Sequence, residues 1–280
     1  HLTTYYDEHN QIAWGYMRAE PRPCFTNTLL GELTSWWRGI SSRIDNPGVA
    51  DTRYVVLASS HAGVYNLGGD LNLFHKLIQD RDYDNLLRYA HACIDALYLN
   101  AMHLSRPQVK TITLVQGDAL GGGFECALSG NVLIAERGCK LGFPEILFNL
   151  FPGMGALTLL GRKIGYQEAE KIILSGKLYS AEELFEIGAV DVLAEEGEGE
   201  IAVYEFVRKE AKQRNGCFAL RAAREIAQPI SYDELIRIAE LWVDAALRLE
   251  HKDLRMMERL VSRQNAKSQT TTQASTQLSA

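Results

Sequence analysis

The chain has 280 residues, of which 46% are hydrophobic and 23% charged, and its formal net charge is −6 at pH 7. These are ordinary globular proportions, so they exclude a disordered, collagen-like or low-complexity protein. The acidic balance argues against a nucleic-acid-binding protein. Because no stretch approaches about 18 consecutive apolar residues, membrane insertion is not expected.

The cysteine and histidine patterns argue against a disulfide framework and a metal site. The five cysteines are odd in number, widely spaced and never arranged as C-x-x-C. The seven histidines form no H-E-x-x-H or similar metal spacing. We therefore expect a cytoplasmic protein with no metal, since a reducing compartment suits unpaired cysteines. No other cofactor is expected, and the phosphate-binding patterns G-x-G-x-x-G after a strand and G-x-x-x-x-G-K-[S/T] are absent.

Hydrophobic periodicity in the first half of the chain alternates between strand and helix patterns. The last of these helices should end before Pro107, because a following proline disfavours helical backbone. The expected elements are a strand in 11–20, a helix from Thr26, a buried strand at 53–59, a loop at 65–70, and helices at 71–78 and 83–104.

The second half continues this alternation and then becomes mostly helical, which favours an α/β fold. Ser180 and Glu183 form a capping-box pattern at a helix start. The expected elements are strands at 111–116 and 131–136, a turn at 117–123, a short helix at 124–130, an extended piece at 140–143 and a helix or helix pair at 233–263. We expect a core at 1–190, a helical region at 191–265 and a disordered tail at 266–280.

Two glycine-rich segments each join an expected strand to an expected helix. Gly68-Gly69-Asp70 is typical of a tight turn whose Asp caps the helix, although glycine also lets a backbone N–H approach a ligand oxygen. Gly121-Gly122-Gly123 is harder to explain as a turn alone, because three consecutive glycines are conformationally costly. Exposed N–H groups at a helix start form a natural anion site.

Two glutamates stand close to these segments. Glu125 follows the three glycines directly, and Glu145 follows Pro144 in Gly142-Phe-Pro-Glu145. Pro144 and Glu145 are typical of a first helical turn, where proline and acidic residues are favoured. Alternatively, both carboxyls face one apolar cleft, where they can hold different protonation states and work as an acid–base pair. The residue pattern leaves both interpretations open.

The combined motifs resemble the crotonase (enoyl-CoA hydratase/isomerase) superfamily. The resemblance rests on Asn66-Leu-Gly-Gly-Asp-Leu71, Gln116-Gly-Asp-Ala-Leu-Gly-Gly-Gly-Phe-Glu125 and Leu141-Gly-Phe-Pro-Glu-Ile146, and it extends from about Val55 to Asp191. It implies a crotonase fold, a spiral of ββα units followed by a C-terminal helical region. It also implies an oxyanion hole formed by the backbone N–H groups of Gly69 and Gly122, with Glu125 and Glu145 as the catalytic acid–base pair.

Within this superfamily the chain looks most like the bacterial diffusible signal factor synthases. The features behind this are Arg22-Pro-Cys-Phe-Thr26, Asn66-Leu67 before the first glycine, and an additional stretch at 38–51. The resemblance implies dehydration of a 3-hydroxyacyl chain on acyl carrier protein, followed by thioester hydrolysis to a free cis-2-unsaturated fatty acid for quorum sensing. The alternatives are an enoyl-CoA hydratase/isomerase of fatty-acid metabolism using a CoA thioester, and a non-catalytic crotonase-fold binding module.

The same resemblance implies an apolar acyl pocket and a set of partners. Candidate pocket residues are Leu67, Leu147, Phe148, Leu150, Phe151, Met154 and Trp242. Relatives usually form trimers or hexamers through C-terminal helices, so we expect a homo-oligomer, and a sensor histidine kinase is a further candidate partner. In the role assignment we favour, Glu145 protonates the departing hydroxyl and Glu125 takes the α-proton.

Overall fold

The computed structural model describes residues 1–44, 52–260 and 262. Two sheets organise it: a six-stranded sheet of order β1-β2-β3-β5-β7-β10 and a four-stranded sheet of order β4-β6-β8-β9. Neighbouring strands are parallel except in the β1–β2 and β8–β9 pairs. The strands are β1 (Leu2–Asp7), β2 (Ile12–Met17), β3 (Tyr54–Ser59), β4 (Gly63–Asn66), β5 (Lys110–Val115), β6 (Gly117–Leu120), β7 (Val132–Glu136), β8 (Lys140–Gly142), β9 (Leu178–Ser180) and β10 (Val192–Ala194).

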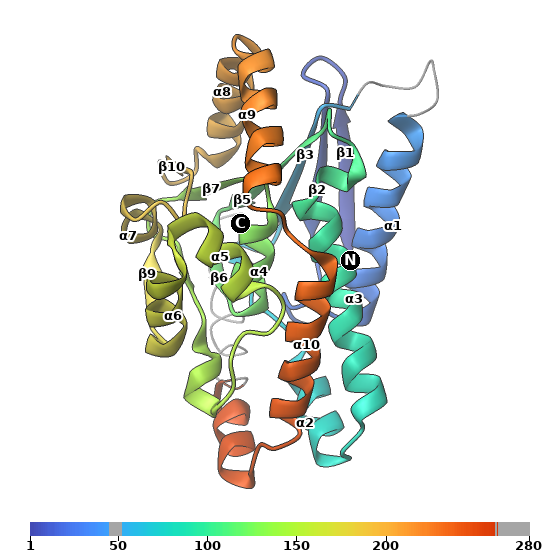
Figure 1. The fold of residues 1–280 in the computed structure, drawn as a ribbon, viewed down its shortest axis with the longest axis vertical. Coiled ribbons are helices and arrows are strands. Elements are labelled where there is room, and N and C mark those ends of the chain that lie inside the picture. Colours follow the sequence, from blue (N-terminus) through green and yellow to red (C-terminus); the bar gives the residue numbers. More distant parts are fainter. Residues whose placement is uncertain (45–51, 261, 263–280) are drawn as a thin grey trace, which may run out of the picture.

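Helices surround these sheets and make up most of the chain after β8 (Figure 1). They are α1 (Asn27–Ile44), α2 (Leu71–Gln79), α3 (Tyr83–Ala101), α4 (Gly122–Ser129), α5 (Ala156–Ile164), α6 (Tyr166–Ser175), α7 (Ala181–Glu186), α8 (Gly199–Ala211), α9 (Arg214–Ala227) and α10 (Tyr232–Ala246). Two 3₁₀ helices are η1 (His103–Ser105) and η2 (Pro144–Phe148). A final helical segment covers 251–260.

The strands form three successive pairs, which confirms the expected spiral of ββα units. In β3–β4, β5–β6 and β7–β8, the first strand belongs to the six-stranded sheet and the second to the four-stranded sheet. A helical segment follows each pair. Within the four-stranded sheet, β4 and β6 pack so closely that a Cβ at Gly117 would collide with the backbone at Gly63.

The structure corrects several sequence-based boundaries. The segment at 65–70 begins inside β4, and the expected turn at 117–123 begins with β6. Helix α3 ends at Ala101 rather than at 104, because His103, Leu104 and Ser105 all adopt left-handed backbone. The expected capping box at Ser180 and Glu183 is confirmed at the start of α7.

The stretch at 38–51 and the tail at 266–280 lie partly or wholly outside the described residues. The additional stretch at 38–51 lies on α1 as far as Ile44, and its remainder lies outside the described residues. The tail at 266–280 also lies outside them. The expected helix or helix pair at 233–263 is a pair, because α10 ends at Ala246 and the next helical segment begins at 251.

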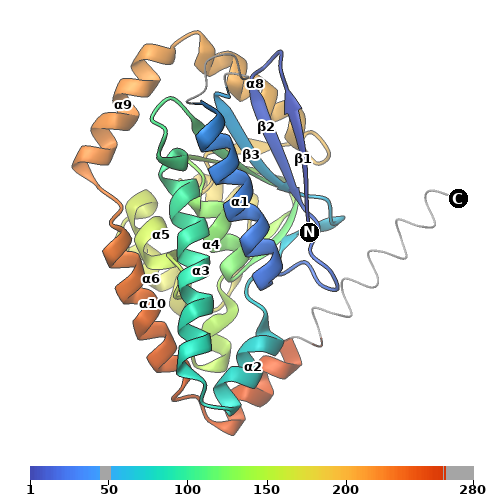
Figure 2. The ribbon, with the colours of Figure 1, turned by 90° about the vertical axis from the view of Figure 1, so that its right-hand side faces the viewer.

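Helices α1 and α3 lie side by side over the sheets and run in the same direction (Figure 2). Their inner faces belong to the largest apolar core, with Leu29, Leu33, Leu86 and Ile94 each at most 1% exposed. This pair of helices therefore forms one wall of the protein interior.

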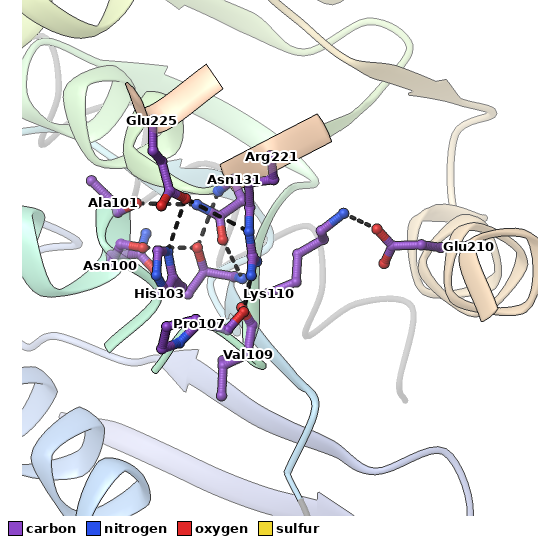
Figure 3. Close-up of polar contacts among 11 residues, drawn as sticks. Asn100, Ala101, His103, Pro107, Val109, Lys110, Asn131, Glu210, Arg221 and Glu225 are labelled. Atoms are coloured by element: carbon purple, nitrogen blue, oxygen red, sulfur yellow. Dashed lines mark hydrogen bonds and ion pairs between the residues drawn. The ribbon is translucent and has the colours of Figure 1, made fainter. Parts of the chain in front are cut away.

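Helix α9 is attached differently, by polar contacts along one face (Figure 3). None of its residues is buried. Arg221 donates hydrogen bonds to the carbonyls of Pro107 and Val109, and Glu225 lies 3.6 Å from Nδ1 of His103. These contacts fasten α9 to the segment that links α3 to β5.

Candidate active site

Two glycine loops meet where β4 and β6 end. Gly68 and Gly69 connect β4 to α2, and Gly121 and Gly122 connect β6 to α4. Because β4 and β6 are neighbouring parallel strands, their carboxyl ends lie together. A Cβ on Gly68 would lie 3.0 Å from the Gly122 nitrogen, and one on Gly122 would lie 3.4 Å from the Gly69 nitrogen. The backbone nitrogens of the two loops are thus close neighbours.

The Gly122 N–H is placed to bind a negative oxygen. Gly122 is the first residue of α4, so its N–H has no acceptor one turn earlier in the helix. It also lies at the positive end of the helix dipole. On the other loop, Asp70 caps α2 by accepting from the N–H groups of Asn72 (3.2 Å) and Leu73 (3.3 Å). The helix-capping interpretation of Asp70 is therefore confirmed.

Glu125 projects from the first turn of α4 and is 2% exposed. Its Oε1 accepts hydrogen bonds from the backbone N–H groups of Met154 (2.7 Å) and Ala156 (3.0 Å). These two donors favour the ionised carboxylate, but the larger effect of burial raises the pKa of Glu125 to about 7. Burial therefore makes Glu125 harder to ionise than an exposed glutamate.

Glu145 lies on η2, and its carboxyl end is buried although the residue as a whole is partly exposed. Its Oε2 has no hydrogen-bond partner among the described residues. The carboxyl packs so closely over Gly121 that a Cβ there would collide with Oε1, and Gly121 also has a φ of +54°. Burial, and secondly repulsion from Glu125, raise the pKa of Glu145 to about 8. Glu145 therefore retains its proton at neutral pH more readily than Glu125.

One cavity joins both glutamates, both glycine loops and a mainly apolar lining. Of the sequence-predicted acyl-pocket residues, those in the lining are Leu67, Phe148, Leu150, Met154 and Trp242. Leu147 is 49% exposed and Phe151 packs against the core, and neither lines the cavity. The structure thus brings together the four predicted catalytic positions and five of the seven predicted pocket residues.

The segment at 22–26 contacts the chain on both sides of Gly69. The Phe25 N–H donates to the Gly68 carbonyl at 2.8 Å, and the Leu67 N–H donates to the Pro23 carbonyl at 2.7 Å. Arg22 forms an ion pair with Asp70 at 2.8 Å. The segment at 22–26 therefore supports this glycine loop from outside.

Helices α1 and α3 supply pocket residues that the sequence analysis missed. These are Leu30, Leu33, Trp37, Tyr89, Cys93, Ala96 and Leu97. Their helical spacing was the available signal, but it also fits residues that simply fill a core.

The described residues offer neither a metal site nor a membrane-spanning helix. No group of three or more His, Cys, Asp or Glu side chains within the described ranges is arranged to hold a metal ion. Among the helices in the same part of the chain, none is both long and apolar enough to span a membrane.

Fold and site together define a crotonase-type protein, in which a ββα spiral presents two glycine N–H groups beside buried carboxyls. The chain belongs to the enoyl-CoA hydratase/isomerase family, whose model matches residues 49–214. A Bacillus subtilis protein named as a putative enoyl-CoA hydratase/isomerase is 32% identical over 172 residues, which cover 61% of this chain and 62% of that protein. The matches span between 16% and 62% of the lengths of the curated relatives.

Solved structures show the same fold. The enoyl-CoA hydratase of Bacillus halodurans aligns with a TM-score of 0.76 at 19% identity, covering 92% of this chain and 99% of that one. The human mitochondrial delta3-delta2-enoyl-CoA isomerase aligns with a TM-score of 0.75 at 17% identity, covering 95% and 98%.

Proposed function

We propose that the protein removes water from 3-hydroxyacyl thioesters. The observation that carries this proposal is the burial of the Glu125 and Glu145 carboxyls in one apolar cavity, beside the N–H groups of Gly69 and Gly122. Two N–H donors stabilise the negative oxygen of an enolate, and one such donor typically contributes about 10²–10³ in rate. Two carboxyls of different pKa provide the acid and the base.

The two carboxyl environments support a division of roles. Glu125, whose Oε1 is held by two backbone N–H groups, is the more readily ionised carboxyl and removes the α-proton. Glu145 keeps its proton through burial and the nearby Glu125, and it donates that proton to the departing 3-hydroxyl group. Electrons from the broken C–H bond form the double bond as the C–O bond breaks and water leaves.

We propose further that the thioester is then hydrolysed, releasing a cis-2-unsaturated fatty acid that serves as a diffusible signal. This finer assignment is supported by the resemblance of 22–26 and 66–67 to signal synthases. It is also supported by the contacts of 22–26 with Leu67, Gly68 and Asp70. Acyl carrier protein is the proposed carrier and a sensor histidine kinase a proposed partner. No metal or other cofactor enters the proposed reaction.

The second candidate is an enoyl-CoA hydratase/isomerase acting on CoA thioesters in fatty-acid metabolism. It is favoured by the family match and by the names of the relatives. The two candidates share the same glycines and glutamates and differ in carrier and product. A non-catalytic binding module is the third, and it would give no reason to retain two buried glutamates.

Product analysis by mass spectrometry separates these candidates. The protein is incubated with 3-hydroxydodecanoyl chains carried on acyl carrier protein and, in parallel, on CoA. Free cis-2-enoic acid, absent with Glu125→Gln and with Glu145→Gln, is the expected result. Reversible formation of trans-2-enoyl-CoA without acid release would identify a metabolic hydratase. No product from either carrier would support the binding module.

We also propose that the protein forms homo-oligomers, and α9 supports this. Its inner face carries Arg221 and Glu225, whereas Ile226, 84% exposed, and Ala223 lie on the opposite face. An apolar outer face on a surface helix is suited to a second copy of the chain. Ile226→Glu is expected to lower the mass measured by light scattering, whereas Ile201→Glu on α8 is the exposed control; unchanged mass would contradict the proposal.

A further inference from the structure

Two hydrogen bonds fix the relative position of α1 and α3. Near the start of α1, the Tyr89 hydroxyl of α3 donates to the Phe25 carbonyl at 2.5 Å. Near its end, the Ser41 hydroxyl donates to the carbonyl of Leu104, just beyond α3, at 3.0 Å. The two partners are 64 residues apart in the first bond and 63 in the second, so the parallel helices keep a nearly constant register. A residue on α1 therefore lies level with the residue about 64 positions later.

This register orders the cavity lining from one end to the other. The lining begins at the Gly68–Gly69 loop, which lies beside Tyr89, since a Cβ on Gly69 would lie 3.6 Å from the Tyr89 hydroxyl. Leu33 then lies level with Ala96 and Leu97, the last residues of α3 in the lining. Trp37 is the last lining residue of α1 and lies roughly 6 Å beyond Leu33, at 1.5 Å per residue.

By this register Trp37, the last lining residue of α1, lies farthest along the helix from the Gly68–Gly69 loop. Its indole is 1% exposed and buried in the main core. Leu30 and Trp37 are seven residues apart, so the α1 side of the cavity runs for roughly 10 Å away from the catalytic end. About one helical turn before Trp37, Ala96 of α3 contributes only a methyl group to the lining, so a larger side chain there would extend into the cavity.

We propose that Trp37 and Ala96 set the length of the acyl chain that the protein accepts. This inference rests on the proposed function, because it takes the cavity to be the acyl site. The reacting carbons lie between Glu125 and Glu145, the chain runs between α1 and α3, and its methyl end meets the Trp37 indole. Each methylene that enters this apolar space tightens binding by about fourfold, until the chain reaches the indole.

The test measures binding without turnover. The probes are 2-oxoalkyl thioethers of pantetheine, from hexyl to hexadecyl, which keep a carbonyl oxygen and cannot be hydrolysed. Pantetheine is common to CoA and to acyl carrier protein, so the result does not depend on the carrier. Calorimetry on the wild type is expected to show affinity that rises with each methylene and stops rising at one chain length.

Ala96→Leu should move that limit to shorter chains by roughly two methylenes and weaken binding of the longest chains on the order of tenfold. Trp37→Leu should move it to longer chains. The matched control is Ala92→Leu, on the same helix but outside the lining, which should leave the limit unchanged. If Trp37→Leu does not fold, Ala96→Leu alone decides.

The outcomes separate the two proposals. An unchanged limit in a folded Ala96→Leu variant overturns the chain-length assignment, whatever the enzyme's turnover. A shifted limit with no product from any thioester supports the assignment and overturns the proposed dehydration. No probe binding to the wild type overturns the acyl role of the cavity, and with it both proposals.

Discussion

Helices α4 and α9 differ in how deeply they are buried in the protein. Seven of the eight residues of α4 are buried, including the carboxyl of Glu125, and its glycines pack against neighbouring backbone. Helix α9 has fourteen residues and none is buried. Its inner face makes polar contacts, and its outer face carries Ile226 at 84% exposure.

Helices α4 and α9 therefore differ in how much tertiary packing stabilises them. A buried carboxyl is costly even when two backbone N–H groups donate to it, and it persists only where the surrounding packing holds it in place. Helix α4 has that packing and carries a catalytic candidate, whereas α9 lacks it and is held by a few hydrogen bonds. Variants of the two helices should therefore differ both in kind and in size of effect.

The largest expected effect concerns activity. Glu125→Gln preserves the shape of the side chain but removes the proposed base, so the rate of the proposed dehydration should fall by about 10²–10⁴. The measurement is kcat on the 3-hydroxyacyl thioester that the wild type turns over. Glu186→Gln, an exposed glutamate on α7, is the control and should keep wild-type activity. Activity within a few-fold of wild type in Glu125→Gln would exclude this residue as the base.

Replacing a glycine in each helix tests the packing contrast directly. A Cβ at Gly123 of α4 would collide with the Asn66 carbonyl, so Gly123→Ala should destabilise the fold by roughly 3 kcal/mol or prevent folding. A Cβ at Gly216 of α9 meets no atom of the described part of the chain within 4 Å, so Gly216→Ala should stabilise the fold by about 0.5–1 kcal/mol. Urea denaturation measures both, and equal effects would contradict the contrast.

Stability should depend on pH through Glu145. Because the fold raises the pKa of Glu145 to about 8 from its ordinary value of 4.5, the folded state binds the proton more tightly than the unfolded chain. Ionising the buried Glu145 carboxyl lowers the free energy of unfolding. This loss is absent below pH 4.5, grows as pH rises, and is complete above about pH 8. Glu145→Gln removes it, so the variant should gain roughly 1–3 kcal/mol over the wild type at high pH and little at low pH. Thermal melts across this range provide the measurement, and a pH-independent difference would contradict it.

The smallest expected effect belongs to the attachment of α9. Arg221→Ala removes the hydrogen bonds to the carbonyls of Pro107 and Val109, and it should cost about 1 kcal/mol or less in global stability. Its clearer effect should be faster hydrogen exchange confined to α9. Exchange that speeds up equally in α4 would show that α9 is integral to the core.

Local features of the site could be predicted from the sequence because they depend on neighbouring residues. Asp70 at the start of α2 and the Ser180–Glu183 capping box were predictable, since caps act within one helical turn. The glycine run before Glu125 was informative for the same reason. The strand β6 and the left-handed turn at η1 were missed, because pairing across the second sheet and tertiary contacts determine them.

The sequence alone determined the glycine motifs, the two glutamates and the order of strands and helices that makes this a crotonase-family chain. Only the tertiary structure decided that Leu147 lies outside the cavity while Trp37 and Ala96 line it. The physical reason is that helical spacing identifies an apolar face but not what that face meets. The position of α1 along α3 depends on hydrogen bonds between residues more than sixty positions apart, which only the folded chain brings together.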